Sequence, residues 1–507
     1  MKNKSIKFAG LAISIAVISA CSAEFENPIG DQNHSTGTAD FSQFVAVGDS
    51  LTAGYADNAL YQSGQEKSMP AILAQQFSKA EGVNREFKQP LMNDNLGGLL
   101  FGGTANPEFG NRLVFDAATE SPEPIAGEPT TEVLATAPLT GPFNNMGVPG
   151  AKSFHFGASG YGNSAGLLTD PVTANPYYAR FASATDATVI GDAASQQPSF
   201  FVMWVGNNDA LAYATSGGIG TDQNGNLDPT SYGSDDITDP TVFAGTYDQL
   251  IGAITAANPN AKGVLVNIPD VSTIPFFTTV PHNPVPLDQT TADALNDITA
   301  YGGYNAGLGL ALQGGAITEE EYNRRLITFS ASSNNALVII DEDLTDLTGL
   351  NPALTNMRQA TGDDLILLTS SSLIGIPAIA GDLTKLWGIS APFLDEHVLT
   401  ETEVETVETA RAAFNAKIKS TADGNANFLF YDSAAAMAEL KNDGVAYGTG
   451  YIDANYVTGG GFSLDGVHPT SRGYAVVANQ MIDVINTGFG ANVPKVNPGG
   501  YSTVALK

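Results

Sequence analysis

Short runs of almost purely apolar residues constrain the fold of this chain more than any other feature. The runs occupy residues 44–47, 200–205, 263–268 and 428–431, with a weaker one at 336–340. Runs of this length are typical of strands buried on both faces of a parallel sheet. Helix-like stretches follow at residues 246–257, 401–421 and 471–486. This alternation predicts an α/β fold with three layers, α/β/α, around a mostly parallel sheet.

The rest of the length is predicted to be insertion. Residues 62–140 are rich in Gly, Pro, Asn and Thr and show little periodicity. Residues 275–425 mix helices with an uncharged stretch at residues 365–381. Insertions on the loop side of a sheet usually shape access to a site. We therefore expect one domain over residues 41–507 that carries two large insertions.

The first forty residues have the layout of an export signal followed by a tether. Three lysines precede an apolar run at residues 8–20, which is the order of a secretory signal and is short for a transmembrane helix. The run ends in Ile-Ser-Ala-Cys, which resembles a bacterial lipobox. We expect removal of residues 1–20 and lipid modification of Cys21, with residues 21–40 as a flexible tether. The alternative is a cysteine that stands near the cleavage site by chance.

The acidic net charge argues against two classes of binding partner. The formal net charge is −31, from 22 Lys and Arg against 53 Asp and Glu, and this repels nucleic acids and anionic lipid headgroups alike. Lipidated Cys21 would then supply the membrane attachment, and as the only cysteine it allows no internal disulfide. Ser22, in place of an aspartate, predicts an exported lipoprotein of the outer membrane, on its periplasmic face or at the cell surface.

A candidate nucleophile directly follows the first buried run. Ser50 lies in Gly-Asp-Ser-Leu, and residues 51–61 are expected to begin a helix. A helix N-terminus would place backbone N–H groups near the Ser50 hydroxyl. The alternative is a serine that only caps a helix after a glycine turn.

Three further segments carry groups that suit ester hydrolysis. His468 follows Asp465 by three residues, so one turn can hold a base and the carboxylate that orients it. The side-chain amide of Asn208 and the backbone N–H of Gly147 can each donate to an oxyanion. Each segment alone also fits an ordinary cap or turn.

Taken in chain order, these segments resemble the SGNH (GDSL) family of ester hydrolases. The resemblance covers residues 41–61, 141–150, 200–212, 262–269 and 463–486. It implies an SGNH/flavodoxin-like fold with no cofactor. It also implies Ser50 as nucleophile, His468 as general base and acid, and Asp465 as the orienting carboxylate. An oxyanion hole would be formed by Ser50 N–H, Gly147 N–H and Asn208. No Gly-x-Ser-x-Gly occurs, which argues against the larger α/β-hydrolase fold.

The predicted activity is that of a serine carboxylic ester hydrolase, lipase- or acylhydrolase-like. The partner would be an ester substrate, either a lipid or an acylated glycan. Residues 365–381, with Leu386, Trp387, Phe393 and Leu394, would form an apolar trough for an acyl chain or simply the core of the insertion. One alternative is a glycan O-acetylesterase. Another is a surface lipoprotein that binds lipid or glycan without turnover.

A weak calcium candidate lies outside these segments. Asp222, Asn224, Asn226 and Asp228 alternate oxygen-bearing side chains around Gly225. The segment lacks the full twelve-residue loop and its terminal glutamate. The alternative is a surface Asn-Gly turn. No other metal motif is present, so we predict no metal elsewhere.

Overall fold

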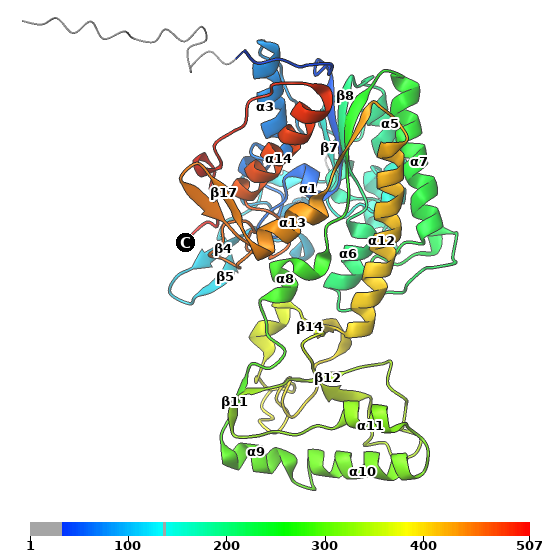
Figure 1. Cartoon of the computed structure of the whole chain (residues 1–507), viewed down its shortest axis with the longest axis vertical. Coiled ribbons are helices and arrows are strands. Elements are labelled where there is room, and N and C mark those ends of the chain that lie inside the picture. Colours follow the sequence, from blue (N-terminus) through cyan, green and yellow to red (C-terminus); the bar gives the residue numbers. More distant parts are fainter. Residues whose placement is uncertain (1–32, 135–137) are drawn as a thin grey trace, which may run out of the picture.

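The computed structural model describes residues 33–134 and 138–507 (Figure 1). The expected signal peptide and Cys21 lie outside the described residues, so the lipid anchor and the location of the protein stay predictions. Within those ranges no helix is both long enough and apolar enough to cross a bilayer.

Five parallel strands form the central sheet, in the spatial order β16-β9-β8-β1-β7. Their bounds are β1 Phe44–Gly48, β7 Asn145–Gly147, β8 Phe200–Trp204, β9 Lys262–Val266 and β16 Phe428–Tyr431. Gly48 pairs with Trp204 on one side and with Gly147 on the other. The predicted α/β fold with a mostly parallel sheet is confirmed. The segments after β1 and β8 leave the sheet at the same edge, where sites gather in such folds.

Helices cover both faces of this sheet (Figure 1). One face packs against α3 (Met69–Glu81) and α14 (Ser471–Phe489). The other packs against α5 (Val189–Ala194), α7 (Pro240–Ala257) and α12 (Glu401–Asp423). Alternate residues of each strand point to opposite layers, as Val45 and Ala46 of β1 do. The remaining helices of this body are α1 Ser50–Ala53, α2 Gln62–Gln65, α4 Pro176–Ala179, α6 Asn208–Thr215, α8 Pro275–Thr278 and α13 Ser433–Asn442.

A second lobe, residues 279–400, extends from the body (Figure 1). We call it the inserted lobe. Its helices are α9 Gln289–Asn296, α10 Tyr301–Gln313 and α11 Glu319–Arg325. Its paired strands are β10 Val285–Leu287 with β11 Ser332–Asn335, β12 Val338–Ile340 with β13 Met357–Gln359, and β14 Leu365–Ile366 with β15 Val398–Leu399. Two apolar clusters of its own hold it together.

Short strands decorate the body outside the central sheet. They are β2 Leu99–Phe101, β3 Thr104–Ala105, β4 Leu113–Asp116, β5 Ser121–Pro124, β6 Thr131–Glu132, β17 Val445–Tyr447 and β18 Gly450–Ile452.

Several predicted boundaries are wrong. The insertion predicted at residues 62–140 contains α3, whose apolar face packs against α14 in the body core. The insertion predicted at residues 275–425 contains α12, which covers the sheet. The run at residues 336–340 does form a strand, but β12 pairs antiparallel with β13 inside the lobe.

Two shorter elements also differ from expectation. The helix after Ser50 lasts only to Ala53, because Gly54 adopts a left-handed backbone with φ of +88°. The predicted tether runs too far towards the domain. Ser35 bridges to Asn492, and the N–H of Thr38 donates to the Phe489 carbonyl at 2.9 Å, so this segment is bound to the end of α14.

Candidate active site

The end of β1 holds Ser50 in a tight turn. A Cβ atom on Gly48 would lie 2.1 Å from Thr52 Oγ1, so only glycine fits there. Asp49 caps α1, and its Oδ1 accepts from the N–H of Leu51 at 3.1 Å. Ser50 itself is 8% exposed, which leaves its hydroxyl at the floor of a pocket.

The same turn is tied to the end of β8. The side-chain amide of Asn207 donates to Asp49 Oδ2 at 2.7 Å, and both side chains are buried. Burial raises the pKa of Asp49 to about 6, against the lowering effect of the hydrogen bonds from Asn207 and Leu51. This contact fixes the ends of two neighbouring strands, and sequence reasoning assigned it no role.

Ser50, His468 and Asp465 lie in hydrogen-bonding contact. His468 Nε2 is 2.8 Å from Ser50 Oγ, and His468 Nδ1 is 3.0 Å from Asp465 Oδ2. Burial alone would raise the pKa of Asp465, but His468 and hydrogen bonds from the backbone N–H groups of His468 and Asn58 lower it to about 2. Asp465 is therefore a carboxylate that accepts from one imidazole nitrogen while the other nitrogen faces the serine.

A strained turn after α1 braces the Asp465 segment. Asp57 and Asn58 both have positive φ, 53° and 62°, which is costly for residues with a Cβ. The N–H of Asp57 donates to Ser463 Oγ at 2.9 Å, and the N–H of Asn58 donates to Asp465 Oδ2 at 3.0 Å. The strain is thus stored where the serine segment meets the histidine segment.

Asn208 and Asp209 begin α6 at the same edge of the sheet. Asn208 lines the Ser50 pocket, and its amide donates one hydrogen bond, to the Ala151 carbonyl at 3.0 Å. Asp209 is fully buried and accepts from Ser153 twice, from its N–H at 2.7 Å and its Oγ at 2.6 Å. These contacts hold the segment after β7 against α6.

Gly147 does not reach the pocket, so its predicted place in an oxyanion hole is wrong. It is the last residue of β7, and its N–H donates to Asn145 Oδ1 at 3.0 Å. A Cβ atom on it would lie 2.3 Å from the Ala53 nitrogen, so glycine serves the packing of α1 on β7. Gly150, three residues later, lines the pocket beside Ser50 with φ of +78°. In the described chain its N–H makes no hydrogen bond.

Comparison with known families agrees with this geometry. The model of the GDSL-like lipase/acylhydrolase family matches residues 44–481. The chain belongs to this family. Searches of curated proteins and of solved structures found no match. GDSL-family proteins are hydrolases of ester bonds, so an ester is the expected class of substrate.

The pocket of this GDSL-family chain has a volume of about 510 Å³. Aromatic rings and polar groups from several segments share its wall. The aromatic residues are Tyr55, Phe109, Tyr177 and Phe276. Phe109 and its neighbour Glu108 come from the insertion after α3, and Phe276 comes from α8 at the root of the inserted lobe. Residues of both predicted insertions therefore form part of the pocket wall.

The segment predicted as an acyl trough lies outside the wall of the Ser50 pocket. None of the residues from 365–381, nor Leu386, Trp387, Phe393 or Leu394, lines the Ser50 pocket. Phe393 is fully buried and Trp387 packs beside it, in a lobe cluster with Ile339 and Val398. Ile366 and Leu367 are buried in the core, whereas Ile376 and Ile379 are exposed on the surface of the lobe.

The calcium candidate forms a series of turns. Asp222 Oδ1 accepts from the N–H of Asn224 at 3.1 Å, and Asn226 Oδ1 accepts from the N–H of Asp228 at 3.1 Å. Asp228 caps the short turn that follows. These oxygens are used locally, and calcium binding by this loop stays a prediction.

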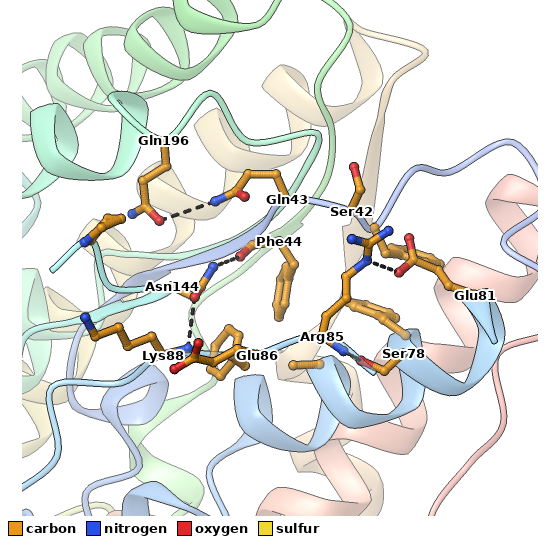
Figure 2. Close-up of a pocket in the computed structure, with 15 residues that line it drawn as sticks. Ser42, Gln43, Phe44, Ser78, Glu81, Arg85, Glu86, Lys88, Asn144 and Gln196 are labelled. Atoms are coloured by element: carbon orange, nitrogen blue, oxygen red, sulfur yellow. Dashed lines mark hydrogen bonds and ion pairs between the residues drawn. The ribbon is translucent and has the colours of Figure 1, made fainter. Parts of the chain in front are cut away.

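A second pocket lies at the opposite end of the sheet (Figure 2). It measures about 350 Å³ and is built around the amino end of β1. Asn144 bridges it, donating to the Phe44 carbonyl and accepting from the N–H of Lys88, each at 2.9 Å (Figure 2). No histidine lines it, whereas His468 lines the Ser50 pocket.

Proposed function

We propose that this chain is a serine carboxylic ester hydrolase that works through an acyl intermediate on Ser50. The observation that carries the proposal is the pair of contacts from His468, 2.8 Å to Ser50 Oγ and 3.0 Å to Asp465 Oδ2. A serine hydroxyl is a weak nucleophile until a base within hydrogen-bonding reach takes its proton. This arrangement supplies that base and the carboxylate that orients it.

In the proposed reaction, Ser50 Oγ bonds to the ester carbonyl carbon while His468 Nε2 takes its proton. The oxyanion accepts from the N–H groups of Ser50 and Gly150 and from the second hydrogen of the Asn208 amide. The carbon–oxygen bond to the alcohol then breaks, and the alcohol leaves with the proton from His468. Water, deprotonated by His468, repeats these steps on the acyl-enzyme and releases the acid. Asp465 stabilises the imidazolium in both halves.

The pocket wall supports two substrate classes. The four aromatic residues favour an acyl chain, as in a lipase or acylhydrolase. Glu108, Asp235 and Asn58 on the same wall can bind sugar hydroxyl groups, which favours a glycan O-acetylesterase. A non-catalytic lipid- or glycan-binding protein would require an inert Ser50.

The test is hydrolysis by the purified full-length protein of nitrophenyl esters from acetyl to palmitoyl, and of an acetylated polysaccharide. We expect Ser50→Ala to lose at least about 10⁴-fold in kcat, because a triad works as a unit. Ser333→Ala, an exposed position in the inserted lobe, is the matched control and should keep full activity. A preference for longer acyl chains selects the lipase-like class, and activity on acetyl esters alone selects the deacetylase. Wild-type protein that is inert on every ester would sink the proposal.

A further inference from the structure

Three carboxylates from distant segments meet where the inserted lobe joins the body. Glu342 follows β12, Asp395 begins the turn before β15, and Glu403 lies in the first turn of α12. One oxygen of each lies within 4.8 Å of the others. Figure 1 shows α12 running from the body to this junction. The cluster lies outside the Ser50 pocket, since none of the three residues lines it.

The Glu403 carboxylate is only half satisfied. The residue is 5% exposed, and its Oε2 accepts from the N–H and the Oγ1 of Thr400 at 2.7 and 2.8 Å. Its Oε1 is buried and accepts no hydrogen bond from any residue that the structure describes. Asp395 Oδ1 is in the same condition. A buried carboxylate oxygen without a donor is costly and calls for a counter-charge or a proton.

Arg324 contacts Asp341 at 3.3 Å and Glu401 at 3.9 Å, and among the described residues it makes no ion pair with the three clustered carboxylates. Burial, then Glu342 and Glu396, raise the pKa of Asp395 to about 7. Burial raises the pKa of Glu403 to about 8, with Glu342 and Asp395 adding to it and the Thr400 hydrogen bonds opposing it. The charged groups that act most on both carboxyls are thus other acids.

We propose that Glu342, Asp395 and Glu403 bind a divalent cation, Ca²⁺, at the junction of the inserted lobe and the body. All three ligands are hard oxygens, which Ca²⁺ prefers at about 2.3–2.6 Å. Two oxygens at that distance from one ion lie no more than about 5 Å apart, and one oxygen of each residue lies within 4.8 Å of the others. Ca²⁺ also accepts the irregular geometry that two loops and a helix end provide.

Such an ion would tie the lobe to the body. Glu342 and Asp395 belong to the lobe, and Glu403 belongs to α12 of the body. The Asp395 turn also packs on the end of α6, since a Cβ atom on Gly217 would lie 2.3 Å from the Asp395 carbonyl oxygen. We therefore expect Ca²⁺ to raise the unfolding temperature as well as to bind.

The test measures Ca²⁺ affinity of the full-length protein, stripped with a chelator, by competition with a chromophoric chelator. Glu342→Gln and Asp395→Asn should each weaken this ion at least about tenfold and abolish its effect on the unfolding temperature. Asp343→Asn removes the same charge beside Glu342 and should bind like wild type. Since Glu342 is exposed, its variant should fold normally even if Asp395→Asn does not.

A fourth variant separates this site from the turn-rich loop at residues 222–228. Asp222→Asn should leave the ion in place. The proposal is overturned if wild type binds no Ca²⁺, if both junction variants bind as tightly as Asp343→Asn, or if only Asp222→Asn removes the ion.

Discussion

Replacing Asp465 with asparagine should reverse the direction of the hydrogen bond at Ser50. Asp465 Oδ1 accepts from the N–H groups of Val467 and His468, both at 2.8 Å, which favours the amide oxygen in that place. The amide nitrogen then faces His468 Nδ1 and the N–H of Asn58. Nδ1 has to accept, so the ring proton moves to Nε2. Nε2 would then donate to Ser50 and could no longer take its proton.

A wrong tautomer of this kind costs about 10⁴-fold in rate, which is roughly 5 kcal/mol at 1.36 kcal/mol for each factor of ten. The backbone N–H of Asn58, which donates to Asp465 Oδ2 in wild type, would also face the new side-chain amide N–H. Two facing donors cost about 1–3 kcal/mol in stability. The two effects are separable, because the first acts on kcat of the folded enzyme and the second on the free energy of unfolding.

The assay is kcat for a nitrophenyl ester at a temperature where circular dichroism shows the variant folded. Asp483→Asn, an exposed change of the same charge on α14, is the control and should keep wild-type kcat. A folded Asp465→Asn protein within tenfold of wild type would refute the reasoning, and His468 would need another partner to orient it.

Two further predictions concern groups around the serine. Asn208→Ala should lower kcat by about 10²–10³-fold without loss of folding, because one oxyanion donor is removed, and an unchanged kcat would exclude that role. The pKa of Asp49, about 6 when folded, lies above its unfolded value of about 4, so the folded state holds a proton between these values that the unfolded state has lost. Its contribution to the free energy of unfolding is therefore fully present below pH 4 and declines as pH rises through 6, by up to about 3 kcal/mol. Urea unfolding at pH 4 and pH 7 measures this decline in the free energy of unfolding. The decline should be smaller for Asp49→Asn than for wild type, and equal declines would contradict the assignment to Asp49.

The core of the fold was predictable because its strands are buried on both faces. Such strands read as continuous apolar runs, and β1, β8, β9 and β16 do so. The edge strand β7 was missed, since Asn-Met-Gly carries no such run. Residues 336–340 have the same pattern, yet they pair within the lobe, because an apolar run does not specify its partner strand.

In the site, too, contacts within a local motif were predictable and contacts between distant segments were not. Asp465 and His468 sit in one local motif, so their contact follows from residue type and spacing. The contact of Ser50 with His468 joins residues 418 positions apart and was expected only from the family resemblance. The choice between Gly147 and Gly150 depends on where β7 ends, which the sequence Asn-Met-Gly-Val-Pro-Gly does not mark. The brace from Asn58 to Asp465 joins residues 407 positions apart, and no local pattern indicates such a contact.

The inserted lobe contacts the loop that carries Asp465 and His468, but it does not line the Ser50 pocket. Phe276, in α8 next to the lobe, lines the Ser50 pocket. The residues of the predicted trough do not line it. The lobe does contact the catalytic loop, however. A Cβ atom on Gly466 would lie 2.9 Å from Cδ2 of Leu368, which belongs to the lobe. The N–H of Phe276, in α8 of the body beside the lobe, donates to the Gly466 carbonyl at 2.9 Å. Gly466 lies between Asp465 and His468, so the lobe packs through Leu368 on the loop that carries both residues.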